Sequence, residues 1–176
     1  GTFKDSIFCK NWGEIKKAGI KRGAYHFFRP NVPAEKQAVN FLTWIDMEVG
    51  DLAPVLDIEV RDNVSPDSLL KSVGVWLKLV EETLGIKPII YTNQKFFNSY
   101  LSGHFTNYPI WIARYSSWRY PALMTEQNWT FWQYGSKGRL EGIAGYVDFN
   151  VFKGKEKDLE NFCLSHSSAS SSFAAP

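Results

Sequence analysis

Two kinds of hydrophobic pattern alternate along most of the chain. Continuous apolar runs, of the length expected for buried strands, alternate with stretches in which apolar residues recur every three or four positions, as on one face of a helix. The runs that predict strands lie at 23–28, 53–59, 87–92, 109–115, 129–134 and 146–152. The stretches that predict helices lie at 3–18, 34–45, 65–84, 94–101 and 156–164.

Residues that favour helix ends and turns support these boundaries. Ser65, Pro66 and Asp67 form a strong helix start, because a serine side chain can cap the first amides and proline fits the first turn. Gly85 is placed to end the same helix. Pro30 similarly closes the first predicted strand.

The last third of the chain departs from this alternation. Strands 129–134 and 146–152 are separated by a Gly-rich connection of the hairpin type, with no helix between them. Early alternation of strands and helices, followed by strands with short connections, predicts an α/β fold. We expect a TIM-like (β/α) barrel whose final third is poor in helices. In such barrels the functional residues sit at the carboxyl ends of the strands.

The stretch 53–59 is an apolar run that ends in two carboxylates, Asp57 and Glu59. Strand side chains alternate in direction, so both acids would project from one face, roughly 6.5–7 Å apart along the backbone. Desolvation and mutual repulsion should make one of them hold its proton to higher pH. A glycosidase needs this division, in which one carboxyl protonates the leaving oxygen and its partner stays charged. By itself the pattern is common, and a strand that simply ends in solvent would also show it.

Further polar and aromatic residues lie near the ends of other predicted strands. They are Tyr91, Tyr115, Gln133 and Asp148. In a parallel barrel these side chains would meet Glu59 on a single rim, which favours a site over an isolated pair of acids. His26, inside a predicted strand, is interpreted as a core histidine and not as a catalyst.

Composition excludes several classes of function. The chain has 176 residues, enough for one domain with a sizeable core. Its 20 basic and 18 acidic residues give a net charge of +2, too small to predict nucleic acid or a membrane surface as a partner. No apolar run approaches the roughly 20 residues that span a bilayer. Three scattered histidines and the absence of a C-x-x-C motif argue against a structural zinc site.

The two ends of the chain carry the cysteines and a tail of distinct composition. Cys9 and Cys163 are the only cysteines. They are either free thiols or a disulfide that joins the ends, and we favour free thiols. Residues 1–164 are predicted to form the folded domain, and the Ser/Ala-rich segment 165–176 a flexible tail or linker.

As a set, the motifs resemble the glycoside hydrolase family 25 lysozymes, also called Chalaropsis-type N-acetylmuramidases. The matching segments follow the family's order and cover nearly everything before the tail. They are AGI at 18–20, RGAYHF at 22–27, PVLDIE at 54–59, YT at 91–92, WIARY at 111–115, WQY at 132–134 and GYVDFN at 145–150.

This resemblance implies hydrolysis, outside the cytoplasm, of the β-1,4 bond between N-acetylmuramic acid and N-acetylglucosamine in bacterial peptidoglycan. Glu59 would be the general acid. Asp57 would be its charged neighbour, which orients or stabilises the sugar's acetamido group while that group's oxygen attacks the anomeric carbon. Asp148 would complete the acidic rim. The residues that would shape the sugar subsites are Tyr25, Tyr91, Trp111, Tyr115 and Gln133. No metal or organic cofactor is implied, and we expect a monomer.

One feature of the family is missing at the N-terminal end of the chain. Members open with a strand of the type G-x-D-x-S, whose aspartate belongs to the active site, and a second strand follows it. We therefore expect that the first strand or strands, roughly 30–45 residues, are absent from this chain. It would then be a fragment of a longer enzyme, which we favour, or a degenerate homologue. A barrel without its first strand has two unpaired edges.

Two other functions fit parts of the pattern. A non-catalytic peptidoglycan-binding remnant would keep the groove and lose turnover. A chitinase-type glycosidase would also end a barrel strand in D-x-E. Such enzymes usually carry another acid two residues before the aspartate, where this chain has Val55.

Overall fold

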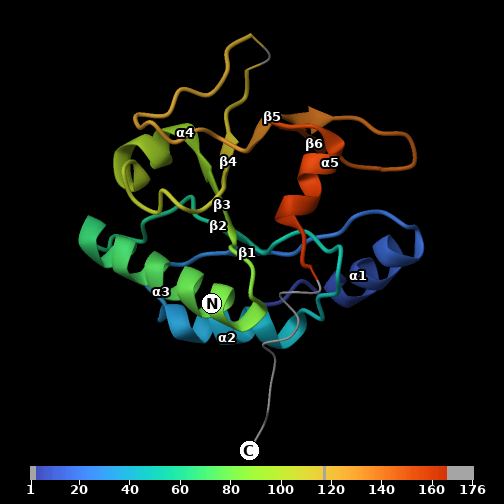
Figure 1. Ribbon diagram of the computed structural model, residues 1–176, viewed down its shortest axis with the longest axis horizontal. Helices are drawn as coiled ribbons and strands as arrows, with labels where there is room; N and C mark the ends of the chain where they lie inside the picture. Colours follow the sequence, from blue (N-terminus) through green and yellow to red (C-terminus); the bar gives the residue numbers. More distant parts are fainter. Residues whose placement is uncertain (1–2, 117, 166–176) are drawn as a thin grey trace, which may run out of the picture.

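The computed structural model describes residues 3–116 and 118–165 and contains one central sheet (Figure 1). The six strands lie in chain order, β1-β2-β3-β4-β5-β6. Strands β1 to β5 are parallel, and β6 pairs antiparallel with β5, as the Gly-rich connection predicted. Their bounds are β1 (Tyr25–Phe27), β2 (Val55–Asp57), β3 (Ile89–Asn93), β4 (Ile110–Ala113), β5 (Phe131–Gly138) and β6 (Val147–Phe152).

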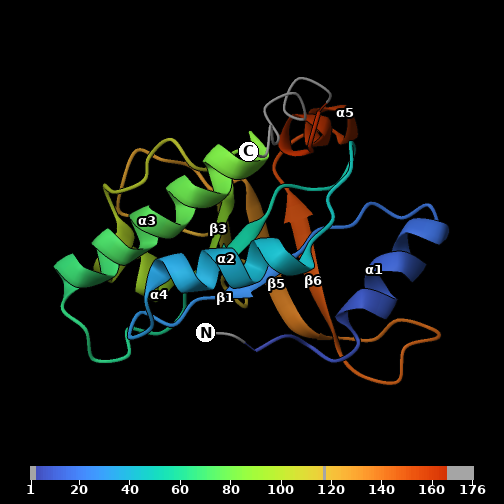
Figure 2. The same cartoon turned by 90° about the horizontal axis from the view of Figure 1, so that it is seen from below.

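The helices lie between these strands and at the two ends of the described chain. Helices α2 and α3 lie side by side across one face of the sheet, and α1 lies apart from them (Figure 2). A π-helical turn, Phe97–Leu101, continues α4, and a 3-10 turn, Glu160–Phe162, continues α5. The helix bounds are α1 (Phe8–Lys17), α2 (Ala34–Trp44), α3 (Pro66–Leu84), α4 (Gln94–Phe96) and α5 (Glu156–Leu159).

The residues of α3 show why the helix forms where the sequence predicts it. The Ser65 hydroxyl accepts a hydrogen bond from the Ser68 amide at 3.2 Å, and Pro66 occupies the first helical position. Gly85 ends the helix in the left-handed conformation, with φ of 67°, and its amide donates to the Glu81 carbonyl. Of the predicted apolar stripe, Leu69, Val73, Leu77 and Val80 are buried and Leu70 is partly buried.

The last helix is shorter than the predicted 156–164. It ends at Leu159, and the residues after the 3-10 turn pair with the chain that leads into β2. The Ala53 amide donates to the Phe162 carbonyl and the Leu164 amide to the Asp51 carbonyl, both at 2.8 Å. This pairing requires extended backbone at residues 163–164, which a continuing helix does not allow. Similarly, α1 begins at Phe8 and not at Phe3, because residues 3–5 have no regular secondary structure and residues 6–7 form a turn.

The main core lies between the sheet and the helices α2 and α3. Trp76 is fully buried there, and the His26 ring stacks on it with 5.8 Å between ring centroids. The Nε2 atom of His26 lies 3.0 Å from Oε1 of Gln37. Burial lowers the pKa of His26, although the contact with Gln37 acts in the opposite direction. The interpretation of His26 as a satisfied core histidine is confirmed.

The opposite face of the sheet has a smaller core of its own. Ala53, Val55, Ile89 and Phe131 are buried together there, and partly buried rings such as Phe162 pack against them. This cluster lies near the starts of β2, β3 and β5.

Among the described residues, the sheet does not close into a barrel. Strand β1 pairs only with β2, and β6 pairs only with β5. The α/β architecture with a helix-poor final third is therefore confirmed, whereas a complete TIM barrel is not seen. The open edge leaves large side chains of β1 accessible, with Tyr25 69% and Phe27 41% exposed.

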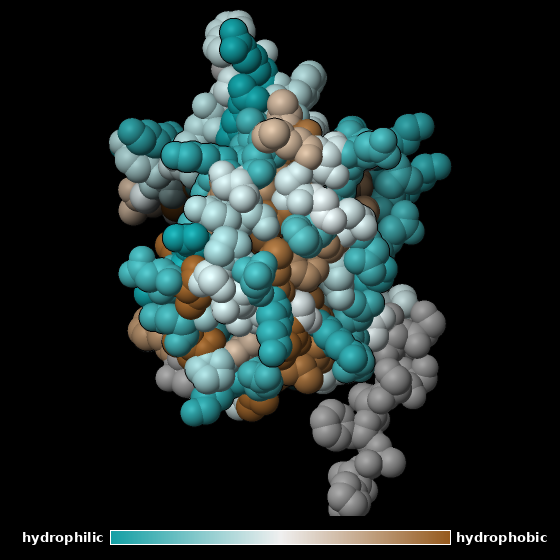
Figure 3. All heavy atoms as spheres, turned by 90° about the vertical axis from the view of Figure 1, so that its left-hand side faces the viewer, coloured by the Kyte–Doolittle hydropathy of each residue, from teal (hydrophilic) through white to brown (hydrophobic). Residues whose placement is uncertain are grey.

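Polar and apolar side chains are interspersed on the face of the molecule seen in Figure 3. On the face shown in Figure 3, hydrophobic side chains form narrow strips and small groups bordered by hydrophilic ones. Within residues 3–116 and 118–165, no helix combines the length and hydropathy that a membrane crossing requires.

Both cysteines are free thiols, as favoured from the sequence. Cys9 is exposed, and Cys163 is buried against the chain near Leu52. Of the predicted tail, 165–176, only Ser165 lies within the described residues.

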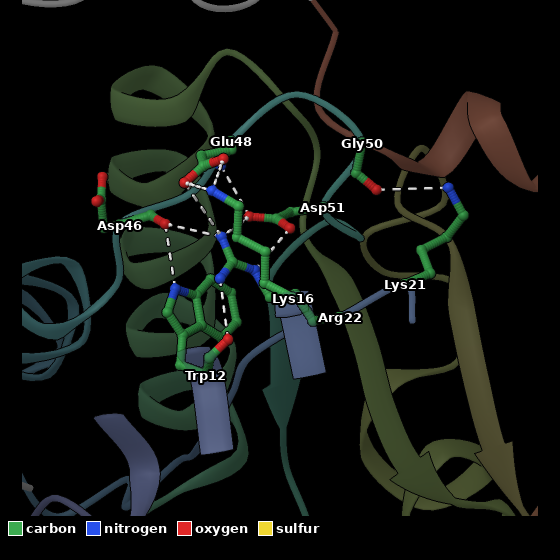
Figure 4. A network of polar contacts seen from close by, with 8 residues as sticks. All are labelled: Trp12, Lys16, Lys21, Arg22, Asp46, Glu48, Gly50 and Asp51. Carbon is green, nitrogen blue, oxygen red and sulfur yellow. Dashed lines mark hydrogen bonds and ion pairs between the residues drawn. The ribbon is translucent and has the colours of Figure 1, made fainter. Parts of the chain in front are cut away.

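Helix α1, which has no fully buried residue, is attached through a polar network centred on Arg22 (Figure 4). The Arg22 guanidinium is buried and donates to both carboxylate oxygens of Asp51, at 2.8 and 3.0 Å. It also donates to the Trp12 carbonyl at 3.0 Å and lies 4.0 Å from the centroid of that indole ring. An outer ion pair joins Lys16 to Glu48 at 2.5 Å. Because residues 22 and 51 precede β1 and β2, the network fixes where both strands begin.

The Asp51→Asn substitution should destabilise the protein far more than loss of the outer ion pair. It leaves the buried Arg22 cation without a full counter-charge, which should lower the free energy of unfolding by about 3 kcal/mol. The matched control, Glu48→Gln, breaks the exposed pair with Lys16 and a longer contact with Arg22 at 3.7 Å, and should cost less than about 1 kcal/mol. Urea unfolding of the two variants and the wild type measures both values. Equal and small losses would contradict the central role of the Arg22–Asp51 pair.

Candidate functional site

A pocket of about 380 Å³ lies on the side of the sheet that faces away from α2 and α3. Every strand of the sheet contributes at least one side chain to its wall. The lining residues are Gly23, Ala24, Tyr25, Leu52, Val55, Asp57, Tyr91, Trp111, Gln133, Asp148 and Asn150.

Strand periodicity and register explain why these residues meet. Leu56 and Ile90 are paired in register and fully buried towards the helices. Their neighbours in sequence, Asp57 and Tyr91, must therefore point to the other face. Asp57 is in register with Tyr91, and Tyr91 with Trp111, so one row of the parallel sheet carries the three side chains into the pocket.

The carboxyl group of Asp57 is the most strongly perturbed acid of the site. Its side chain is buried, and its Oδ1 atom has no hydrogen-bond partner among the described residues. Burial, and then the charge of Glu59, raise the pKa of Asp57 from 3.8 to about 7. The prediction that one acid of the pair holds its proton to higher pH thus applies to Asp57.

Glu59 lies in the loop that follows β2, because the strand ends at Asp57. The chain around it is fixed by hydrogen bonds, with the Ile58 amide donating to the Tyr91 carbonyl at 2.9 Å and the Thr92 hydroxyl donating to the Ile58 carbonyl at 2.5 Å. Beyond Glu59, the Arg29 guanidinium donates to both carboxylate oxygens of Asp62, at 2.7 and 2.8 Å. The loop is therefore held on both sides of the half-buried Glu59.

The Tyr91 hydroxyl lies at the centre of the site and donates a hydrogen bond to Oε1 of Gln133. Its pKa is raised, first by burial and then by charges from four residues of the predicted site. Those residues are, in order of effect, Glu59, Tyr115, Asp57 and Asp148. Their common influence on one hydroxyl shows that the structure brings together residues from four separate segments of the chain.

A second contact crosses the site from β4 to β6. The indole Nε1 atom of Trp111 donates to Oδ1 of Asn150 at 3.0 Å. Asn150 was not among the predicted site residues, although it belongs to the matched segment 145–150. Its position two residues after Asp148 was the available signal, because residues i and i+2 of a strand share a face.

Six of the eight predicted site residues line the pocket. They are Tyr25, Asp57, Tyr91, Trp111, Gln133 and Asp148. The other two, Glu59 and Tyr115, follow the ends of β2 and β4 and lie outside the lining, with Tyr115 63% exposed. Both are close enough to affect the pKa of Tyr91, which lines the pocket.

The pocket combines carboxyl acceptors, amide and hydroxyl donors, and aromatic rings. Such a wall suits a ligand that has apolar ring faces and many hydroxyl or amide groups. In the part of the chain that the structure describes, no three His, Cys, Asp or Glu residues are grouped so that they could hold a metal ion.

Comparisons with known proteins agree with this geometry. The family model described as Glycosyl hydrolases family 25 matches residues 1–143. The Uncharacterized protein YegX of Escherichia coli (strain K12) is 43% identical over 158 residues, which are 90% of this chain and 57% of that protein. Lysozyme M1 of Streptomyces globisporus is 29% identical over 172 residues, covering 90% of this chain and 58% of that protein.

A solved structure shows the same fold. The family 25 glycosyl hydrolase from Bacillus anthracis superposes with a TM-score of 0.84 at 34% identity, covering 93% of this chain and 78% of that chain. The chain spans only 57% of the length of the YegX protein. Since the family model matches residues 1–143 of 176, the chain belongs to family 25 of the glycosyl hydrolases.

Proposed function

We propose that the protein is a lysozyme-type N-acetylmuramidase, which hydrolyses the β-1,4 bond between N-acetylmuramic acid and N-acetylglucosamine in bacterial peptidoglycan. The observation that carries the proposal is the acid pair at the end of β2, where the buried Asp57 lines a pocket and Glu59 lies beside it. The similarity to Lysozyme M1 supports it. The enzyme would act outside the cytoplasm, on the wall, and would degrade it.

In the proposed reaction Glu59 transfers its proton to the glycosidic oxygen while the bond from that oxygen to the anomeric carbon breaks. The acetamido oxygen of the same sugar forms a bond to the anomeric carbon, which gives a cyclic cation. Asp57 accepts the acetamido N–H and balances the positive charge. Water then attacks the anomeric carbon, the bond from that carbon to the acetamido oxygen breaks, and the water gives a proton to Glu59, which restores both the acetamido group and the acid.

Because its pKa is raised, the Asp57 carboxyl holds its proton to higher pH before the sugar binds. At neutral pH the buried Asp57 carboxyl is protonated for part of the time. An acetamido N–H that donates to Asp57 would stabilise its ionised form and lower its pKa. Sugar binding would thereby favour the charged form of Asp57 that the reaction requires.

We also propose that the sheet belongs to a TIM-like barrel in which the protein acts as a monomer. Each edge strand of the described sheet, β1 and β6, has one partner only. The chain covers 78% of the structurally similar Bacillus anthracis enzyme. Additional strands next to β1 would cover Tyr25 and Phe27, which are exposed here.

The Glu59→Gln variant should lose at least about 100-fold in the rate at which reducing ends are released from purified peptidoglycan, because an amide cannot supply the proton. The matched control is Glu35→Gln, which makes the same change on an exposed residue of α2 and should keep the wild-type rate. Full turnover by the Glu59→Gln variant would refute its role as the acid. Tight binding of peptidoglycan without turnover by the wild type would favour the binding-only alternative.

The pH dependence of stability should reveal the buried acid. Because the pKa of Asp57 is raised from 3.8 to about 7 in the folded state, the folded protein binds its proton more tightly than the unfolded chain does. Asp57 should therefore reduce stability progressively as pH rises from about 4 to about 7, by at most about 4 kcal/mol. The Asp57→Asn variant lacks this loss.

Urea unfolding of the wild type and the Asp57→Asn variant, measured at several pH values, tests this expectation. The variant should gain stability relative to the wild type across that pH interval, and the difference should be constant above it. A difference that does not change with pH would show that Asp57 ionises in the folded protein as it does in the unfolded chain.

A further inference from the structure

The side-chain amides of Asn150 and Gln133 are held in fixed orientations by aromatic donors. An indole N–H can only donate, so the 3.0 Å contact with Trp111 assigns Oδ1 of Asn150 to the indole. The Nδ2 group of Asn150, with two N–H donors, must then point away from Trp111. The hydroxyl of Tyr91 donates to Oε1 of Gln133, and because a hydroxyl can also accept, this contact fixes the amide less strictly than the indole fixes Asn150.

The nitrogen atoms of both amides remain available. Neither Nδ2 of Asn150 nor Nε2 of Gln133 has a hydrogen-bond partner among residues 3–116 and 118–165. Both residues line the pocket, and Gln133 is only 3% exposed, so the surface that it retains faces the pocket. Asn150 is exposed on the wall of the pocket, whereas Gln133 is buried, so an acceptor supplied by a ligand in the pocket can pair with both donors.

The two amides are neighbours on adjacent strands. Gln133 of β5 and Asn150 of β6 are Cα partners in the antiparallel pair, so their side chains leave the sheet on one face about 5 Å apart. Asp148 lies two residues before Asn150 on the same face of β6 and also lines the pocket. This corner of the pocket therefore places a carboxylate acceptor next to two amide donors.

An acetamido group complements this arrangement. It carries one N–H donor and one carbonyl acceptor, whereas the free amine of a de-N-acetylated sugar is an ammonium group that only donates. The free amine would leave the donors of Asn150 and Gln133 unpaired, which is the kind of mismatch by which a polar site rejects an analogue.

We propose that Asn150 and Gln133 are specificity-determining donors that bind the carbonyl oxygen of a second acetamido group of the glycan, whose N–H is accepted by Asp148. Trp111 and Tyr91 are positioning residues that set the orientation of the two amides. This inference rests on the proposed muramidase function. Residues of β5 and β6 would thereby select N-acetylglucosamine over glucosamine at the sugar next to the one that reacts.

The decisive variant is Asn150→Asp. It keeps an oxygen for the Trp111 indole and replaces only the amide nitrogen by an acceptor oxygen. Two glycan probes of equal length are used, one fully N-acetylated and one with its glucosamine amines free. The wild type should favour the N-acetylated glycan in kcat/KM by about tenfold or more. In the variant this preference should disappear or reverse, because the new carboxylate repels the carbonyl oxygen and accepts the ammonium group.

The matched control is Asn128→Asp, which makes the same change at an exposed asparagine that accepts from Lys153 outside the pocket. It should keep the wild-type preference. The variant Trp111→Phe keeps a ring but removes the indole donor. It should raise KM for the N-acetylated glycan several-fold and weaken the preference, with little change in kcat. Thermal unfolding of each variant separates these effects from a loss of folding.

The outcomes test the donor assignment separately from the muramidase function. Wild-type hydrolysis with an unchanged preference in the Asn150→Asp variant would overturn the donor assignment and leave the muramidase proposal intact. Equal kcat/KM values of the wild type for the two glycans would also overturn it. Absence of hydrolysis and binding of both glycans by the wild type would refute the muramidase function, and the inference with it.

Discussion

The burial of a carboxyl group at the end of strand β2 is the constraint on which the site depends. Leu56 must face the helical core because it is apolar and fully buried, so strand periodicity turns Asp57 to the opposite face. Parallel register then aligns Asp57 with Tyr91 and Trp111. The same row of hydrogen bonds that forms the sheet therefore brings an acid and two aromatic rings into one pocket.

This burial has electrostatic consequences that extend beyond Asp57. An ionised Asp57 would be poorly solvated and close to the charge of Glu59, so its pKa is raised to about 7. The remaining polar side chains of the wall are held by specific partners, since Gln133 accepts from Tyr91 and Asn150 accepts from Trp111. A wall of oriented donors and acceptors is preorganised for a ligand with matching groups.

The sequence predicted the elements and six residues that line the pocket, because these depend on local patterns. The cap at Ser65, the stop at Gly85 and the acidic end of β2 are all visible in short segments. Features that depend on distant parts of the chain were not predictable. The Trp111–Asn150 contact joins residues 39 positions apart. The choice of Asp57 as the acid with the raised pKa depends on its burial by several strands, and the early end of α5 depends on pairing with residues 51–53.

The fold itself raises the pKa of Asp57, at the end of β2, to about 7. Titration of the Asp57 side-chain carboxyl carbon by NMR, in the free protein, measures this most directly. We predict a titration midpoint of about 7 for Asp57, and a lower midpoint when an N-acetylated glycan occupies the pocket. A midpoint near the ordinary value of 3.8 in the free protein would contradict it.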